Sequence, residues 1–334
     1  MSTCARFILV AFLCPLLAPV FAHAGVTHEV RAGDTLAKIA SEYVPLAASY
    51  TRQEFVDEIK KVNGIDENDL SIGRVITIPV VRSEPVKPAT VKRSRSFEAK
   101  GAYANQFTAS SRQVLTMGEK LRKHGANTVV FDAKEVEGLP TYRSSVPREY
   151  LGLDSYYYPI EDVSKLVDYL HDRGVHVVAR VCIFRDIHNS SKNARWRFDK
   201  EWVNPADRAV QDYNLAIIRE LTSFGVDEIQ VDYFRYPADR KVSTGIEGKT
   251  RSDVLTAYAQ RVHELTSSKG VLLSLDMFGI VIWQREDDVR VLGQDVMRLK
   301  DHFDVISPML YPSHFNRNFS GIANPADQPY MFVS

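Results

Sequence analysis

The chain has 334 residues, and its 42 basic side chains (Lys and Arg) balance its 42 acidic ones (Asp and Glu). This length allows one large domain together with one small domain. Because the formal net charge is zero, the composition argues against nucleic acid or an anionic membrane surface as the main partner.

The first 24 residues are typical of a secretory signal peptide. Arg6 precedes an apolar stretch from residue 7 to residue 21, and Ala22-His23-Ala24 is a small-x-small cleavage site. A membrane anchor is the alternative, but the apolar stretch is short for a span and contains two prolines. We therefore predict cleavage after Ala24, export to the periplasm or the medium, and no transmembrane span in the mature chain.

Residues 27–81 have the pattern of a small separate domain. A short strand beginning at His28 is followed by a turn at Gly33 and by a helix that Asp34 or Thr35 can cap. A second helix near residues 54–62 ends at Asn63-Gly64, which is a good helix stop, and a closing strand covers residues 74–80.

This order of strand, helix, helix and strand resembles a LysM domain. The segments that carry the resemblance are residues 30–36, 62–65 and 72–79. The resemblance implies binding of chains that contain N-acetylglucosamine, above all peptidoglycan; the alternative is a small packing domain without a ligand. The implied groove residues are Gly33, Asp34, Thr35, Leu36, Asn63, Gly64 and Ile65. The connection between the two helices, residues 44–52, is longer than is usual for a LysM domain.

Residues 82–98 differ in composition from both neighbours. They combine several basic residues with two prolines and little that a core could bury. This composition predicts a partly extended linker whose basic side chains are solvated or lie near an anionic cell wall.

From residue 99 onward, apolar strands alternate with amphipathic helices. Strands are expected at residues 101–105, 128–132, 176–184, 227–233, 271–278 and 304–310, and helices near 110–124, 162–173, 206–224, 252–268 and 289–301. Such alternation predicts a parallel sheet with right-handed crossovers. Long loops at 134–160 and 185–204 favour a TIM-type (β/α) barrel. A doubly wound sheet is the alternative, but no glycine-rich phosphate turn follows the first strand.

A carboxylate ends the strand expected at residues 227–233. Side chains alternate along a strand, so Glu228, Gln230 and Asp232 share one face, and Glu228 lies roughly 13 Å from Asp232 at about 3.3 Å per residue. Barrel enzymes present catalytic groups at the carboxyl ends of their strands. We therefore interpret Asp232 as a candidate for chemistry and Glu228 as a residue of the opposite, structural end.

Neighbouring strands carry further polar side chains at a similar depth. Asp276 shares a face with Ser274, and Arg180 faces away from its apolar neighbours. An ion pair between Arg180 and Asp132 or Asp232 could be purely structural. An arginine beside Asp232 would also keep that carboxylate charged, as a nucleophile requires.

Six segments of the large domain resemble a bacterial family, the Putative glycosyl hydrolase domain, once a domain of unknown function. They are residues 177–184, 203–205, 212–214, 227–237, 276–279 and 305–315. The resemblance runs from about residue 99 to the C-terminus and implies a TIM-barrel glycosidase.

Most glycosidases place two carboxyl groups on either side of the scissile bond. By analogy with the alpha-amylase clan, Asp232 is the nucleophile and Asp276 the general acid/base, although that clan uses Glu on the fifth strand. Asp132 is a third carboxylate that can stabilise a developing positive charge or bind a sugar hydroxyl. The other expected substrate-binding residues are Arg180, Tyr233, Arg235, Tyr311 and His314, and Arg235 is also expected to hold a loop carboxylate.

Asp186-Ile187-His188 is not a metal signature by itself, so the sequence predicts no metal site and no cofactor. A deacetylase is therefore a weaker hypothesis. The sequence ends after the sixth expected strand, which predicts a C-terminally truncated barrel with about six of eight strands. The main hypothesis is an exported, cell-wall-associated glycoside hydrolase. The alternative is a non-catalytic peptidoglycan-binding protein with a degenerate barrel.

Overall fold

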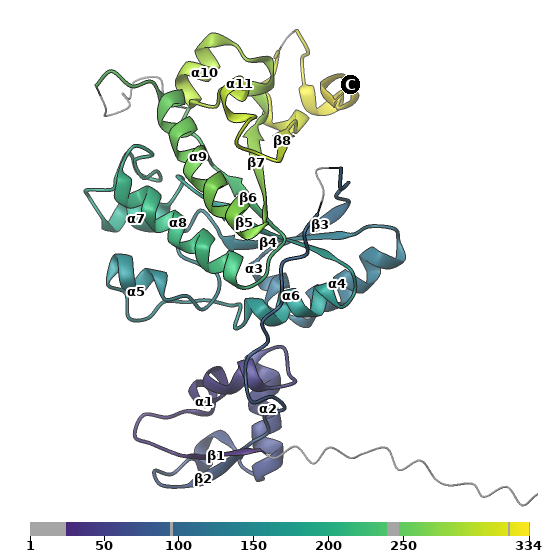
Figure 1. Ribbon diagram of the computed structural model, residues 1–334, viewed down its shortest axis with the longest axis vertical. Coiled ribbons are helices and arrows are strands. Elements are labelled where there is room, and N and C mark those ends of the chain that lie inside the picture. Colours follow the sequence, from purple (N-terminus) through teal and green to yellow (C-terminus); the bar gives the residue numbers. More distant parts are fainter. Residues whose placement is uncertain (1–24, 94–95, 239–246, 320, 334) are drawn as a thin grey trace, which may run out of the picture.

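The computed structural model describes residues 25–93, 96–238, 247–319 and 321–333. The predicted signal peptide, residues 1–24, lies outside these described residues. Figure 1 shows a small N-terminal unit (residues 25–81) against one side of a larger α/β unit (residues 96–333). None of the described helices combines the length and apolar character that a membrane span needs.

The N-terminal unit consists of two helices packed on a two-stranded antiparallel sheet. Its elements are β1 (Val26–Glu29), α1 (Leu36–Tyr43), the short helix η1 (Val44–Leu46), α2 (Arg52–Asn63), η2 (Glu67–Asp69) and β2 (Val75–Ile78). Of the two candidate caps, the Thr35 side chain caps α1 by accepting the backbone N–H of Lys38. Helix α2 ends at Asn63, and its C-cap Gly64 has a φ of 58°, a left-handed conformation that favours glycine, as the Asn-Gly stop predicts.

The α/β unit is built on six parallel strands in the order in which they occur along the chain. These strands are β3 (Gly101–Ala104), β4 (Thr128–Lys134), β5 (His176–Cys182), β6 (Glu228–Asp232), β7 (Leu272–Phe278) and β8 (Val305–Met309). Sequential parallel strands joined by helices are the TIM-type (β/α) architecture that the sequence predicts. In the described sheet, β3 and β8 are the edge strands.

Helices cover the outer face of this sheet (Figure 1). The helices of this unit are α3 (Gln106–Ala109), α4 (Arg112–Lys123), α5 (Val146–Leu151), α6 (Val163–His171), α7 (Ile187–Lys192), α8 (Arg208–Ser223), α9 (Arg251–Lys269), α10 (Glu286–Leu292), α11 (Val296–Leu299) and α12 (Tyr330–Val333), with the short helices η3 (Gly279–Trp283), η4 (Pro312–His314) and η5 (Pro325–Asp327).

The prediction of a single helix near residues 289–301 is wrong. The chain forms α10 and α11 instead, because Gly293 has a φ of 80° and ends α10. Asp295 then caps the second helix with its side chain.

The two faces of the sheet differ as the alternation of side chains predicts. Ala179, Ile229 and Leu275 point outward and are fully buried beneath the helices. Arg180 and Gln230, which follow in the alternate positions, point inward and stay partly exposed. The apolar core therefore lies between sheet and helices, and the polar residues gather inside the curve of the sheet.

The described residues of segment 82–98 form no helix or strand and expose Arg82, Lys87 and Lys92, as an extended linker should, but they also contact the α/β unit. The Thr90 hydroxyl donates to the backbone oxygen of Val226 at 3.1 Å, and the Val91 N–H donates to Oδ1 of Asp227 at 2.7 Å. We call the described part of this segment, residues 82–93 and 96–98, the strap. It crosses the amino ends of the barrel strands, opposite the ends that carry Asp232 and Asp276.

Two close approaches fix the strap further. A Cβ atom at Gly225 would lie 2.2 Å from the carbonyl oxygen of Pro88, so only glycine fits there. The ring of Phe97 lies 4.7 Å from the ring of His176 at the start of β5. The basic composition of the segment concealed these contacts, because they use backbone groups and small or aromatic side chains.

Candidate functional site

A cavity of about 940 Å³ lies inside the curve of the sheet. Its lining includes Tyr103, Arg180, Gln230, Asp232, Tyr233, Asp276, Ser307 and Tyr311. These residues come from five of the six strands (β3, β5, β6, β7 and β8) and from the segments that follow β6 and β8. The cavity therefore gathers most of the residues that the sequence selects for chemistry.

Asp232 and Asp276 lie side by side in the sheet. Val231 pairs with Leu275, so the next residues along the two parallel strands are these aspartates. Asp276 in turn pairs with Ser307 of β8. Both carboxyl groups line the same cavity, which is the arrangement that paired-carboxylate chemistry needs.

Arg180 joins Asp232 to Asp132, so the ion pair expected from the sequence is present. Its Nη2 and Nε atoms donate to Oδ2 of Asp232 at 2.6 and 3.1 Å, and Nη1 donates to Oδ1 of Asp132 at 2.6 Å. The Tyr103 hydroxyl also donates to Asp132. Charge-assisted bonds of this kind are strong and directional. They hold the Asp232 carboxylate in one orientation.

Asp132 itself is fully buried and does not line the cavity. Arg180 and Tyr103 cover its carboxylate. The structure thus places Asp132 behind the cavity wall, where it supports Arg180 and does not face a ligand.

Asp276 has a different environment from Asp232. Burial and the neighbouring Asp232 carboxylate raise the pKa of Asp276 to about 7. The side-chain amide of Gln230 donates to Oδ1 of Asp276 at 3.0 Å. One cavity therefore contains an ion-paired carboxylate and, near neutral pH, a carboxyl group that can carry a proton.

Tyr233 has a left-handed backbone, with a φ of 49°, directly after Asp232. Non-glycine residues adopt this conformation at a cost, and such strain is concentrated at functional sites. The Tyr233 N–H donates to Oδ1 of Asp232 at 2.5 Å, and its hydroxyl accepts a bond from Arg185 at 3.2 Å. This turn brings the Tyr233 side chain to the cavity wall.

Comparison with known proteins identifies both units. Residues 101–334 match the sequence profile of the family described as Putative glycosyl hydrolase domain, which covers more than half of the chain. The chain belongs to this family. Residues 28–79 match the LysM domain. Both resemblances drawn from the sequence are thereby confirmed, and the two units are called the glycosyl hydrolase domain and the LysM domain below.

Several solved structures are similar in fold. A hypothetical protein from Ruminiclostridium thermocellum ATCC 27405 is 27% identical, with a TM-score of 0.45, over 52% of this chain and 96% of its own. The spore cortex-lytic enzyme SleL of Bacillus megaterium QM B1551 is 14% identical, with a TM-score of 0.41. That match covers 92% of this chain, which spans 59% of the SleL chain.

The pneumococcal virulence factor StrH is 10% identical, with a TM-score of 0.46 and 70% of each chain covered. No curated protein is significantly similar in sequence.

Arg235 lies beside the cavity of the glycosyl hydrolase domain and does not line it. Its guanidinium carbon lies 4.8 Å from the ring centre of Trp202 and 4.6 Å from that of Phe278. Burial lowers its pKa to about 10. No carboxylate in the described ranges pairs with it, so the expected loop ion pair is wrong; Arg235 instead packs between aromatic rings, with a bond to the Tyr236 backbone oxygen at 3.1 Å.

Tyr311 and His314 follow β8 in the chain. Tyr311 lines the cavity and is 52% exposed, so a ligand can reach its ring. The side chain of His314 lies outside the part that the structure describes.

The expected LysM groove residues divide into those whose side chains are buried or hydrogen-bonded within the domain and those that stay exposed. The side chains of Leu36 and Ile65 are buried in the LysM core, and Thr35 caps α1. Oδ2 of Asp34 accepts the Arg31 N–H at 2.8 Å.

Asp34 also pairs with His28 at 3.0 Å, and its pKa is lowered chiefly by the bond from the Arg31 backbone. Asn63 uses its amide to bridge Ile59 and Thr77. These polar side chains therefore shape the LysM loops, and Gly33, Thr35 and Gly64 stay exposed where a ligand can reach them.

Sequence reasoning missed Glu135, one residue beyond β4. Burial and the Asp132 carboxylate raise the pKa of Glu135 to about 7. It lines a separate pocket of about 250 Å³ together with Glu137, Tyr157 and His188. Its position directly after a strand is the signal that could have identified it.

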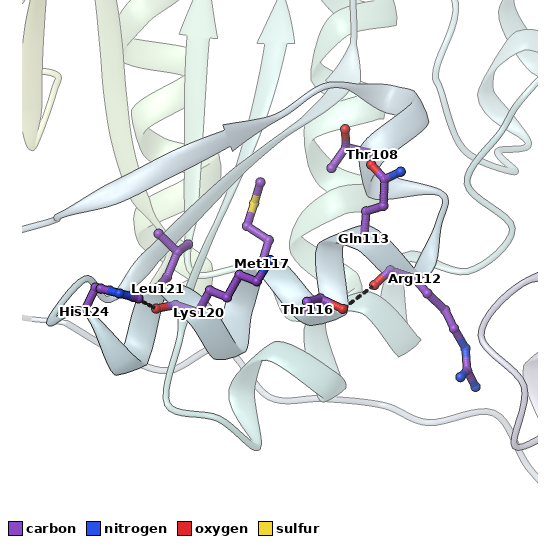
Figure 2. A pocket seen from close by; sticks show the side chains of 8 residues that line it. All are labelled: Thr108, Arg112, Gln113, Thr116, Met117, Lys120, Leu121 and His124. Atoms are coloured by element: carbon purple, nitrogen blue, oxygen red, sulfur yellow. Dashed lines mark hydrogen bonds between the residues drawn. The ribbon is translucent and has the colours of Figure 1, made fainter.

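A further hollow of about 780 Å³ lies along α4, beside Thr108 of α3 (Figure 2). Its lining is Thr108, Arg112, Gln113, Thr116, Met117, Lys120, Leu121 and His124. No carboxylate is among them, so this hollow lacks the acid/base pair that the inner cavity has.

Proposed function

We propose that the chain is an exported, cell-wall-associated glycoside hydrolase that cleaves O-glycosyl bonds with Asp232 and Asp276. One observation carries this proposal. Two neighbouring carboxyl groups line one cavity, and Arg180 pairs with Asp232 while burial raises the pKa of Asp276 to about 7. Pairs of carboxyl groups whose environments differ in this way are typical of glycosidases.

In this proposal the two aspartates have separate roles. Asp276 donates its proton to the leaving glycosidic oxygen, because its raised pKa keeps it protonated near neutral pH. Asp232 attacks the anomeric carbon as the charged nucleophile, with Arg180 fixing its orientation. Water then hydrolyses the glycosyl–Asp232 bond, and the deprotonated Asp276 takes up the proton of that water, which restores both carboxyl groups. Asp132 holds Arg180 from behind.

The substrate is a glycan that contains N-acetylglucosamine, with peptidoglycan as the leading candidate. The LysM family match supports this assignment, as does the predicted export of the chain. Tyr233 and Tyr311 offer aromatic rings at the cavity wall on which a sugar can stack. No cofactor takes part in this scheme.

The experiment compares Asp232→Asn and Asp276→Asn with the wild-type chain from residue 25 onward. Release of reducing sugar is measured on purified peptidoglycan and on oligomers of N-acetylglucosamine. Each substitution should lower turnover by at least about 100-fold, since acid/base groups contribute about 10²–10⁴. Asp154→Asn is the control, because the Asp154 side chain is 91% exposed. Wild-type turnover in both variants would refute the assignment.

A second candidate function is glycan binding without turnover. Gln230 holds one oxygen of Asp276, and aspartate is one methylene shorter than the glutamate of the alpha-amylase clan at this strand. Retention of the wild-type chain on peptidoglycan with no product from a broad glycan panel would support this second function. Recovery or gain of turnover in Asp276→Glu would support the hydrolase.

A further inference from the structure

The LysM domain and the glycosyl hydrolase domain share an interface built by residues 44–51. This segment is the unusually long connection between α1 and α2. Val44 and Ala47 belong to the LysM core, whereas Tyr50 packs against the core of the glycosyl hydrolase domain. The connection thus has apolar contacts in both domains.

Lys165, near the start of α6, closes this interface. Its ammonium group donates to the backbone oxygens of Val44, Ala47 and Ser49, the last two at 2.8 Å. The residue is 7% exposed. Burial lowers the pKa of Lys165 to about 8, which still leaves the ammonium form dominant at neutral pH. The three donors of the ammonium group match these three carbonyl oxygens. The Val44 oxygen also accepts the Ala47 N–H at 3.0 Å, and the Ala47 oxygen also accepts from Nη1 of Arg82 at 2.9 Å.

Further bonds surround this contact. The Tyr50 hydroxyl donates to the Ala109 oxygen at 2.5 Å, and Arg52 pairs with Glu161 at 3.3 Å. The Ser41 hydroxyl also donates to Glu161, at 3.1 Å. Glu161 is largely buried, so this pair is better shielded from solvent than an ordinary surface ion pair.

All these contacts lie at one end of the LysM helices. Helix α2 meets the glycosyl hydrolase domain at Arg52 and ends at Asn63, roughly 17 Å away at about 1.5 Å per residue. Helix α1 meets it near Ser41 and begins at Leu36. The loops at residues 33–36 and 63–65 therefore lie at the far ends of both helices.

We propose that residues 44–51 form an interdomain latch, closed by Lys165, that makes the two domains one rigid particle with the LysM glycan loops facing outward. The chain then holds one glycan segment at a fixed distance from the cavity that contains Asp232 and Asp276. The latch does not depend on the proposed function. Only the statement that the outer LysM loops bind a glycan rests on the proposed function.

The latch is tested on the whole chain from residue 25 by ¹⁵N relaxation and by amide hydrogen exchange. In the wild type, LysM residues should share the rotational correlation time of the glycosyl hydrolase domain. Lys165→Met should give the LysM domain a shorter correlation time and increase exchange of residues 44–51 at least tenfold, because three carbonyls lose the charged donor that ties them to α6. Lys123→Met, at the exposed end of α4, is the control and should change neither.

A shorter correlation time for the LysM domain already in the wild type would overturn the latch, even if Lys165→Met does not fold. So would wild-type exchange of residues 44–51 in Lys165→Met. Titration with a pentamer of N-acetylglucosamine tests the outer loops: the wild type and Lys165→Met should bind it within about twofold of each other. Weaker binding in the variant would overturn the outward placement, whereas no binding to either protein counts against the proposed function and not against the latch.

Discussion

Asp232 and Asp276 lie next to each other on adjacent strands, yet each has a different hydrogen-bond partner, and this difference gives them different electrostatic roles. Asp232 receives the guanidinium of Arg180, and Asp276 receives only the neutral amide of Gln230. A carboxyl group buried without a cation favours its neutral form. The division between nucleophile and acid in the proposed mechanism follows from this difference.

The raised pKa of Asp276 predicts the pH dependence of turnover. Below about pH 7 the carboxyl group keeps the proton that the leaving group needs, and above it the proton is lost. The rate should therefore fall about tenfold per pH unit on the alkaline side. A pH profile of kcat/KM checks this, and a rate that keeps rising through pH 8 would contradict the role of Asp276 as the acid.

Arg180 should matter for stability as well as for chemistry. Arg180→Met leaves the buried Asp132 and Asp232 without their cation, and breaking a buried pair in this way costs about 3–5 kcal/mol. Arg185→Met is the matched comparison, because its partner Glu201 is 49% exposed, and it should cost no more than about 1 kcal/mol. Urea unfolding of both variants measures the difference; equal losses would mean that the Arg180 pair is not structurally important.

At the scale of elements, the turn before β6 depends on the strap. Gly225→Ala should destabilise the fold by about 1–2 kcal/mol for the left-handed backbone. The same substitution should lower the free energy of unfolding by about 1–3 kcal/mol more, because the added methyl group collides with the Pro88 backbone. Gly125→Ala is the control, since Gly125 has a similar φ of 78° with nothing within 4 Å of its Cβ position. Equal unfolding midpoints for the two variants would show that the strap moves away from the added methyl group at little energetic cost.

The six strands could be predicted from the sequence to within a few residues, because a buried parallel strand is apolar and four of them, β4 to β7, follow a helix that ends at a glycine. The Arg180 ion pair was also predictable, since alternation places it on the face of Asp232. The break between α10 and α11 was not, because Gly293 lies within a stretch whose apolar spacing continues.

The strap, the latch and the position of Arg235 were beyond sequence reasoning for a common reason. Each depends on contacts between residues far apart in the chain, and many of these contacts use backbone oxygens. Lys165 illustrates this point: its three partners are carbonyl groups of residues more than a hundred positions away, which no side-chain pattern records. Glu135 differs, because its place after β4 was visible and was overlooked.

For the whole molecule, the latch predicts that the glycosyl hydrolase domain depends on the LysM domain. A chain that begins at residue 82 keeps the strap but leaves Glu161 and Lys165 without their LysM partners. Calorimetry should show a lower unfolding temperature, and the truncated protein should no longer sediment with peptidoglycan. An unchanged unfolding temperature would mean that the interface contributes nothing to stability.

Because the chain is synthesised from its N-terminus, the large sequence separation between the partners in these contacts has a consequence during translation. The LysM core is complete once residue 80 has left the ribosome, since its buried residues all lie between Val30 and Val80. The Lys165 ammonium group emerges 116 or more residues after the carbonyls that it caps, and Asp227 emerges 136 residues after Val91. Until the glycosyl hydrolase domain has been synthesised, Tyr50 and its neighbours have no partner surface to cover them. The nascent chain therefore carries a folded LysM domain with an exposed interface that can make non-native apolar contacts.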